Sequence, residues 1–359
     1  MDINKIRKQY DSNAGIILPP EEEKLWLPSK ALPLNYVLGG GIPYGTIVEE
    51  FGWESTGKSL LAADFGAVAQ ALGGVVLWND AEFAFGDSAN FYRGLKLNPS
   101  EVEILADDAI ERFSDWAMDM CTYYRSKFVN NEPILLVCDS IAALECEEAQ
   151  GGKQSGSKKE MGNRAKAIYK FYRTRRKLLK QLGICTIMIN QVRDKVGANM
   201  FQDSTTTPGG AATAFYASVR LALMRGRNIK DGDMKVGNYV HCFIKKNKVS
   251  TPRDKVLTEV HFKPDLCGYI GYHRYSGLGA ILTLNGFIKK KGKEYTLEGG
   301  IPLGTSKTTL DDAFVTNKKA RLAAIELLDI NTVSKTRAKL LNIDKNLYKV
   351  PAKKKKKED

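Results

Sequence analysis

The residues best suited to chemistry lie at positions 52–59, in the stretch Gly-Trp-Glu-Ser-Thr-Gly-Lys-Ser. This stretch matches the pattern G-x-x-x-x-G-K-[ST], in which backbone N–H groups surround phosphate groups. We expect the Lys58 ammonium to reach the outer phosphates of a nucleoside triphosphate and the Ser59 hydroxyl to bind Mg²⁺. The predicted nucleotide site comprises Gly52, Trp53, Glu54, Ser55, Thr56, Gly57, Lys58 and Ser59.

Both flanks of this stretch have the elements that a phosphate-binding loop requires. Residues 46–51 predict a short buried strand, and residues 60–72 predict an alanine-rich helix that ends at two glycines. A strand, a glycine loop and a helix N-terminus direct N–H groups and the positive end of a helix dipole to one point. A glycine-rich turn without function is the alternative, but it does not explain why both flanks fit.

Three apolar runs predict further buried strands, at residues 75–79, 134–139 and 185–190. Helical stretches separate these runs, so strands and helices alternate along the chain. This order predicts an α/β domain with a mostly parallel sheet. In such a sheet the carboxyl ends of the strands meet at the edge where ligands bind.

Polar side chains follow these strands at the edge where a ligand would lie. We expect Glu82 to orient the attacking water and Asp139 to hold Mg²⁺. Gln191 could hydrogen-bond a γ-phosphate and so report which nucleotide is bound. Either acid could instead cap a helix, but two of them beside a phosphate loop favour a catalytic role.

The composition indicates a protein with a polyanionic partner. The 359 residues carry 54 Lys and Arg against 41 Asp and Glu, a net charge of +13, which suggests nucleic acid, with general solubility as the alternative. The length fits one large core with a smaller domain, and no apolar run reaches the length of a membrane span. Because the N-terminus lacks a signal-peptide pattern, we expect a cytoplasmic location, in a host cell if the protein is viral.

The cysteines and histidines favour neither disulfides nor a metal centre. Six cysteines are scattered without a CxxC pair, and the chain has three histidines. We therefore expect reduced cysteines in the core rather than disulfides or zinc ligands.

Basic residues concentrate before the last of these strands. Residues 151–157 predict a mobile polar loop, and the helix after it carries a basic stripe with spacings of four, three and four. The stripe consists of Lys166, Lys170, Arg173 and Lys177. A solvated helix face is the alternative, but the flexible basic loop beside it favours binding to a phosphate backbone.

A second long connection follows Gln191 and runs to residue 210. Long connections inside a compact domain are usually functional or disordered. This one has two cations, a glycine pair, and the adjacent large side chains of Met200 and Phe201, so it could grip a strand backbone and stack against bases.

The two ends of the chain are too short or too charged to form cores of their own. Residues 3–10 predict an amphipathic helix and residues 15–18 a strand, which must pack on the rest of the chain or on a neighbouring copy. Five consecutive lysines at 353–357 predict a solvated tail. A contact to duplex DNA, a solubility tail and an address signal all remain open for it.

Together these segments resemble the RecA family of recombinases, of phage type, from about residue 6 to residue 328. The resemblance rests on the phosphate loop and on several shorter signatures. These are Leu-Gly-Gly-Gly-Ile-Pro-Tyr-Gly at 38–45, Asp-Ala-Glu at 80–82, Asp-Ser-Ile-Ala-Ala-Leu at 139–144, Asn-Gln-Val-Arg at 190–193, Phe-Tyr-Ala-Ser-Val-Arg at 215–220 and Lys-Lys-Asn-Lys at 245–248. Trp53 departs from the pattern, because the family usually has proline there.

The resemblance implies an ATP- and Mg²⁺-dependent helical filament on single-stranded DNA that pairs it with homologous double-stranded DNA, with no membrane partner. It implies catalytic roles for Glu82 and Gln191, and for Lys246 and Lys248 acting in a neighbouring protomer's site. The metal would be held by Ser59 and Asp139, and adenine would stack on either Phe91 or Tyr92. The DNA-binding positions that it implies are Gly162, Arg164, Lys166, Tyr169, Arg173, Arg193, Lys195, Phe201, Gly209 and Gly210.

The expected architecture is a RecA-type P-loop NTPase core of α/β class with a short N-terminal arm and a small α/β C-terminal domain. We place an oligomerisation arm and linker at 1–28, the core at 29–267, the small domain at 268–349 and a basic tail at 350–359. Two alternatives remain at this point, a ring helicase on the same core and a DNA-coating protein that hardly hydrolyses ATP.

Overall fold

The computed structural model describes residues 25–147, 158–194, 205–208, 211–250, 253, 255–264, 270–307 and 310–329. Its main strands are Thr46–Gly52 (β3), Val75–Asp80 (β4), Val102–Leu105 (β5), Ile134–Asp139 (β6), Cys185–Gln191 (β7), Val219–Asp231 (β10), Met234–Asn247 (β11), Lys255–His261 (β12) and Gly271–Tyr272 (β13). The helices around them are Leu32–Leu38 (α2), Lys58–Ala71 (α3), Phe85–Gly94 (α4), Ile110–Lys127 (α5), Lys158–Gln181 (α7) and Ala211–Tyr216 (α8). Short strands lie at Trp26–Leu27 (β1), Ile42–Pro43 (β2), Arg193–Asp194 (β8) and Thr205–Thr206 (β9).

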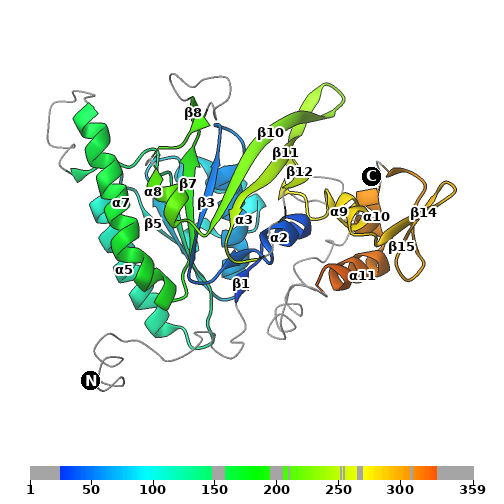
Figure 1. The fold of residues 1–359 in the computed structure, drawn as a ribbon, viewed down its shortest axis with the longest axis horizontal. Coiled ribbons are helices and arrows are strands. Elements are labelled where there is room, and N and C mark those ends of the chain that lie inside the picture. The colour runs from blue at the N-terminus through cyan, green and yellow to red at the C-terminus, as the bar shows by residue number, and fades with distance from the viewer. Residues whose placement is uncertain are drawn as a thin grey trace, which may run out of the picture.

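The nine main strands form one sheet in the order β13-β12-β11-β10-β3-β7-β6-β4-β5 (Figure 1). All neighbours from β10 to β5 are parallel, whereas β10 to β13 pair antiparallel. The predicted mostly parallel α/β sheet is therefore confirmed. Since β3 lies between β7 and β10, the phosphate loop that follows it leaves from the middle of the sheet.

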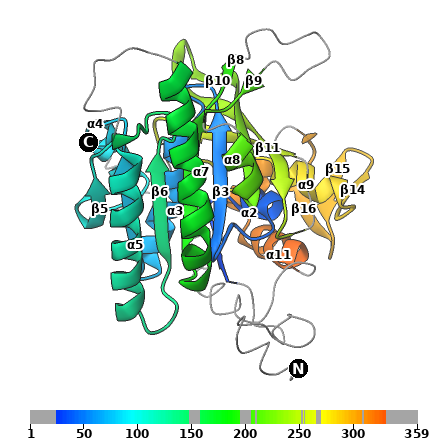
Figure 2. The same cartoon turned by 60° about the vertical axis from the view of Figure 1, so that its left-hand side comes forward.

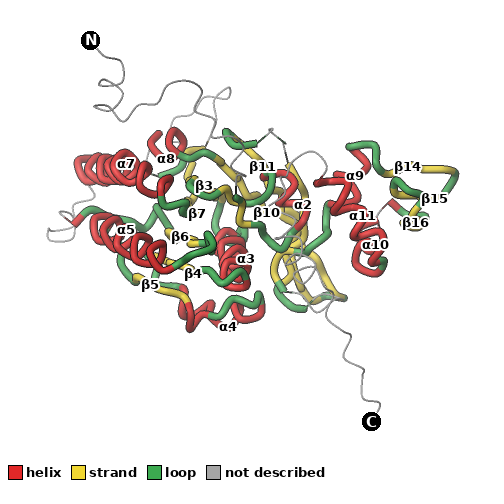
Figure 3. Tube along the Cα trace, turned by 90° about the horizontal axis from the view of Figure 1, so that it is seen from below, coloured by secondary structure: helices red, strands yellow, loops and turns green. Residues whose placement is uncertain are grey.

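Apolar cores on both faces of the sheet explain why its central strands are mostly apolar. Val76 and Trp78 of β4 belong to the cluster that contains α3, whereas Val75 and Leu77 belong to the cluster that contains α5 and α7. Successive strand residues point to opposite faces, so each face has its own core. Figure 3 shows the result, with α5 and α7 on one side of the sheet and α3 on the other.

The C-terminal part of the described chain forms a smaller unit beside the sheet. A three-stranded antiparallel sheet joins Ile288–Lys291 (β14), Glu294–Leu297 (β15) and Ile301–Gly304 (β16). Three helices accompany it, at Leu278–Leu284 (α9), Leu310–Thr316 (α10) and Lys318–Asp329 (α11). Leu278 and Leu282 share one apolar cluster with Leu34 of α2, so this unit packs directly on the main core.

Several predictions concern residues that the structure does not describe. Most of the N-terminal arm, most of the two connections expected to bind DNA, the boundary near residue 267 and the basic tail all lie outside the described residues. Within the described part, no helix is both long and apolar enough to cross a bilayer. The cysteines that it includes are unpaired and buried, as expected of core residues: Cys121, Cys138, Cys146, Cys185 and Cys242.

Candidate nucleotide site and nucleic-acid interface

The phosphate-binding stretch forms a tight turn between β3 and α3. Gly52 is required because a Cβ there would lie 2.3 Å from the Leu223 carbonyl oxygen of β10. Gly57 is required because it has φ +92°, a conformation that side chains disfavour. The Thr56 hydroxyl donates to the Trp53 carbonyl at 2.9 Å, and the Trp53 indole is exposed, so a large side chain in place of proline is accommodated outside the turn.

Lys58 lies across this turn as the first residue of α3. Its ammonium donates to the carbonyl oxygens of Gly52 at 3.1 Å and Trp53 at 2.8 Å. Burial lowers the pKa of Lys58, an effect that the nearby Asp139 and Glu82 carboxylates oppose. The ammonium is thus held at the mouth of the loop, close to the position that a phosphate-binding lysine needs.

Asp139 and Ser59 form the candidate metal site. Burial raises the pKa of Asp139 to about 7, while a hydrogen bond from the Ser59 hydroxyl acts in the opposite direction. A divalent cation fits here, because it would supply the positive charge that this buried carboxylate lacks. Among the described residues, no group of three or more His, Cys, Asp or Glu side chains could hold a metal, so phosphate oxygens and water would have to complete the shell, as Mg²⁺ prefers.

Glu82 stands beside the metal site and has two hydrogen-bond donors. Its Oε1 accepts from the Ser140 hydroxyl at 2.5 Å and from the Gln191 amide at 3.1 Å. The preceding acid, Asp80, has a different role, because its carboxylate accepts from the backbone N–H groups at the start of α4. The ends of β4, β6 and β7 therefore bring Glu82, Ser140 and Gln191 together, as the strand order requires. Sequence reasoning assigned no role to Ser140, although its place directly after a strand-end acid is a usable signal.

The structure places the two aromatic candidates for adenine differently. Tyr92 is buried and packs with Trp78 and Phe85, with ring centroids 5.9 and 5.0 Å away. Phe91 is partly buried at the edge of the same cluster. Tyr92 is thus the more buried of the two rings, and the contact of either ring with adenine stays a prediction.

Lys246 lies away from the phosphate loop of its own chain. It is paired with Arg220 across β10 and β11, and its ammonium donates to the carbonyl oxygens of Ala214 at 2.6 Å and Phe215 at 2.9 Å. Burial lowers its pKa, and the neighbouring cations Lys248 and Arg220 add to this effect. The exposed Lys248 follows at the end of the strand, so the chain presents two adjacent cations at this position.

A buried ion pair links β3 to β10, and sequence reasoning missed it. Glu49, which is fully buried, accepts from Arg220 Nε at 2.5 Å and from the Asn190 amide at 3.0 Å. The same Asn190 amide group donates to the Pro208 carbonyl at 3.0 Å. The Arg220 guanidinium also lies 4.5 Å from the centre of the Phe51 ring. An acid inside an otherwise apolar strand was the available signal.

The basic stripe on α7 is exposed, as a nucleic-acid interface requires. Lys166, Lys170, Arg173 and Lys177 are all exposed along this helix. Tyr169 is also exposed and meets Tyr216 edge-on, with ring centroids 5.6 Å apart.

Arg164 differs from these residues, because its guanidinium pairs with Glu145 at 3.2 Å and donates to the Ala142 carbonyl. This side chain is 15% exposed and connects α7 to the segment after β6, so its contact with DNA stays a prediction.

The remaining predicted DNA-binding positions are only partly described. Gly162 is exposed in the first turns of α7, and Arg193 is exposed in β8, which pairs with β9. Figure 2 shows α5 and α7 side by side, with β8 and β9 at the end of the sheet where the phosphate loop lies. Lys195, Phe201, Gly209 and Gly210 lie outside the described residues.

Comparisons with known proteins point to a single family. The family model described as the RecA N-terminal domain matches residues 1–267. Protein RecA 1 of Myxococcus xanthus is 34% identical over 302 residues, which cover 83% of each chain. Protein RecA of Mycobacterium avium is 35% identical over 82% of this chain and 80% of its own, and Protein RecA of Geobacter sulfurreducens is 30% identical over 83% and 84%. The chain therefore belongs to the RecA family of ATP-dependent DNA recombinases.

Proposed function

We propose that each protomer binds MgATP on its own phosphate loop and that Lys246 and Lys248 of a neighbouring protomer complete the site. The filament on single-stranded DNA is then also the assembly in which the ATPase becomes active, within the cytoplasm. Mg²⁺ at Ser59 and Asp139 would neutralise charge that develops on the phosphates. The protein's own residues bind the triphosphate, orient water and sense the γ-phosphate.

The position of Lys246 is the observation that carries this proposal. Arg220 pairs with Lys246 on one side and with Glu49 on the other, so Lys246 is level with a residue three positions before Gly52. At about 3.3 Å per residue, this offset is about 10 Å along the strands, with two strand spacings across the sheet in addition. Its ammonium also points to the carbonyls of α8, which packs with α7, whereas α3 lies on the opposite face (Figure 3). From this position Lys246 cannot reach the phosphate loop of its own chain, but it can reach the nucleotide site of a neighbouring protomer.

Within one site, Glu82 is the group proposed to orient the attacking water and accept its proton. Ser140 fixes the carboxylate from one side and Gln191 from the other. If the Gln191 side chain turns to a γ-phosphate, its hydrogen bond to Glu82 Oε1 breaks, and this oxygen becomes free to accept a hydrogen bond from the attacking water. We propose that this exchange of partners connects nucleotide binding to hydrolysis, and through the connection after β7 to DNA.

A mixed-filament experiment tests the shared site. Lys246→Ala/Lys248→Ala should keep ATP affinity in the absence of DNA but lose DNA-stimulated hydrolysis, while Lys58→Ala loses its own nucleotide binding. At interfaces where the double variant supplies the phosphate loop and Lys58→Ala supplies the lysines, one complete site exists. Mixtures should therefore be more active than the average of the two variants.

The matched control is Lys235→Ala, an exposed lysine at the other end of β11, which should leave DNA-stimulated hydrolysis unchanged. Mixtures that match the average of the separate activities would show that the lysines do not act between protomers.

A further inference from the structure

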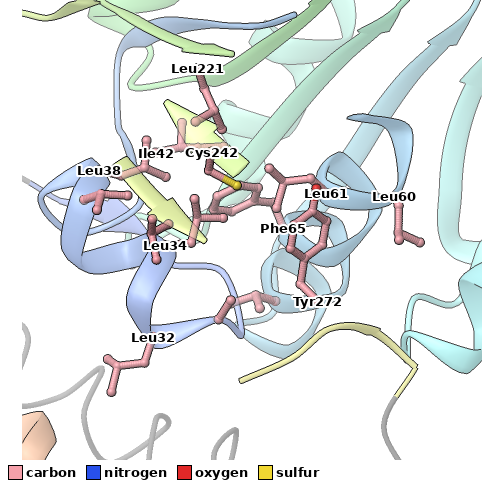
Figure 4. Packing of buried hydrophobic residues seen from close by; sticks show 14 of the residues in the cluster. Leu32, Leu34, Leu38, Ile42, Leu60, Leu61, Phe65, Leu221, Cys242 and Tyr272 are labelled. Carbon is pink, nitrogen blue, oxygen red and sulfur yellow. The ribbon is translucent and has the colours of Figure 1, made fainter. Parts of the chain in front are cut away.

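The hydroxyl of a buried tyrosine contacts the backbone of the phosphate loop. Tyr272, on the edge strand β13, donates to the carbonyl oxygen of Gly57 at 3.3 Å. Its side chain is almost completely buried and lies against α3, near Leu61 and Phe65 (Figure 4). A Cβ built on Gly57 would lie 3.1 Å from this hydroxyl, so the tyrosine closely fits the glycine backbone.

The contact acts on the peptide bond that joins the loop to its lysine. The Gly57 carbonyl also accepts from the Leu61 N–H at 2.9 Å in the first turn of α3. In a trans peptide the C=O and the next N–H point in opposite directions. Two donors that hold the Gly57 carbonyl toward α3 and β13 therefore turn the Lys58 N–H the other way, into the phosphate loop, where it can bind an anion.

Two carboxyl groups act on this hydroxyl, those of Glu50 and Asp64. Glu50 on β3 is fully buried, and neither of its carboxyl oxygens has a hydrogen-bond partner among the described residues. It alternates with Glu49 and so faces α3, as Val48 does. Burial raises the pKa of Glu50 well above its usual range, which favours the neutral form of this carboxyl group.

We propose that Tyr272 is a positioning residue for nucleotide binding: its hydroxyl sets the Gly57–Lys58 peptide so that the Lys58 N–H faces the phosphates. The inference rests on the nucleotide site proposed above. It adds a residue from the far edge of the sheet, on the segment from which the chain continues into α9 and the C-terminal unit.

The test is the affinity for ATP of Tyr272→Phe, which removes one oxygen atom and keeps the ring. We expect the Kd for MgATP to rise about 3- to 10-fold, the range that the loss of one neutral hydrogen bond produces. The kcat at saturating ATP should stay within about 2-fold, since the variant retains Glu82, Gln191 and Asp139. Tyr275→Phe is the matched control, because Tyr275 is also buried and lies three residues further along, where its ring contacts His273. The Kd of Tyr275→Phe for MgATP should not change.

Thermal unfolding of both variants separates positioning from general stability. If Tyr272→Phe and Tyr275→Phe lose similar stability, but only Tyr272→Phe loses affinity well below its Tm, the proposal holds. An unchanged Kd in Tyr272→Phe, or an equal loss in both variants, overturns it.

Lys58→Ala is measured in parallel to separate this inference from the nucleotide site itself. If Lys58→Ala loses ATP binding and Tyr272→Phe does not, only the role of Tyr272 fails. If Lys58→Ala binds ATP normally, the proposed nucleotide site fails and the role of Tyr272 fails with it.

Discussion

The side-chain amide of Gln191 donates to Oε1 of Glu82 at 3.1 Å. The same oxygen accepts from the Ser140 hydroxyl, so the carboxylate is held from β6 and from β7 at once. Gln191 is also the last residue before the connection expected to bind DNA. A displacement of that connection therefore reaches the proposed catalytic carboxylate through a single side chain.

Gln191→Ala should separate hydrolysis from DNA binding. Without the amide, Ser140 remains as a hydrogen-bond partner of Glu82, and the position of this carboxylate no longer depends on Gln191. We expect ATP affinity within about 2-fold of the original, and a ratio of ATPase rates with and without single-stranded DNA that falls toward one. Gln181→Ala, an exposed glutamine at the end of α7, is the control. A variant that DNA still stimulates fully would exclude this role for Gln191.

Glu82→Gln should slow ATP turnover by about 10²-fold or more, since a positioned base typically contributes that much. Binding of ATP and DNA should remain, because the amide keeps the size of the carboxylate. Single-turnover hydrolysis on single-stranded DNA measures the effect, with Glu101→Gln on the exposed turn before β5 as the control. Near-normal turnover in Glu82→Gln would remove Glu82 from catalysis.

The exposed stripe of α7 predicts a change in salt dependence. If Lys166 and Arg173 each contact one phosphate, replacing both by alanine should reduce the slope of log K against log salt by about 1.4 on single-stranded DNA. The matched control replaces Lys127 and Lys180, which are exposed at the C-terminal ends of α5 and α7. Equal slopes for the two double variants would mean that only net charge matters.

Glu50 predicts an unusual dependence of stability on pH. Its raised pKa means that the folded chain keeps a proton that the unfolded chain releases above pH about 4.5, so its contribution to stability falls as pH rises toward the folded pKa. Glu50→Gln has no such proton, and the difference in Tm between the variant and the original should grow in its favour from pH 5 upward. The charged groups that act on Glu50, Asp139 and Lys58, are present in both proteins.

Glu49→Gln is the contrasting variant, because it weakens the ion pair with Arg220 and should lower stability at neutral pH by about 2–3 kcal/mol. A Tm difference for Glu50→Gln that does not change with pH would show that Glu50 titrates normally.

The strands and the phosphate loop could be predicted because their signals are local. An apolar run between turns, or a glycine pattern before a helix, is complete within about fifteen residues. Family membership also selects a recombinase over the ring helicase and the DNA-coating protein that the motifs alone left open.

Partners that are distant in sequence could not be predicted in this way. Glu49 and Glu50 are adjacent residues of the same type, but successive side chains of a strand point to opposite faces of the sheet. Glu49 therefore meets Arg220, 171 positions away, whereas Glu50 has no hydrogen-bond partner among the described residues. Phe91 and Tyr92 differ in the same manner, since the winding of α4 directs only the second into the core. The sequence places Arg164 in a basic helix, but it does not reveal the ion pair that this residue forms with Glu145.

The apolar cluster that α9 shares with α2 has a consequence for how the chain can be divided. Leu278, Leu282 and Phe314 belong to the same cluster as Leu34 and Phe65, so the C-terminal unit serves as one wall of the main core. A fragment that stops before residue 270 would lack this wall and expose to water the apolar surface that it covers, so it should aggregate, even though it retains every residue proposed to touch ATP. The smallest piece of this chain that folds as a soluble ATPase therefore extends well past its last proposed catalytic lysine.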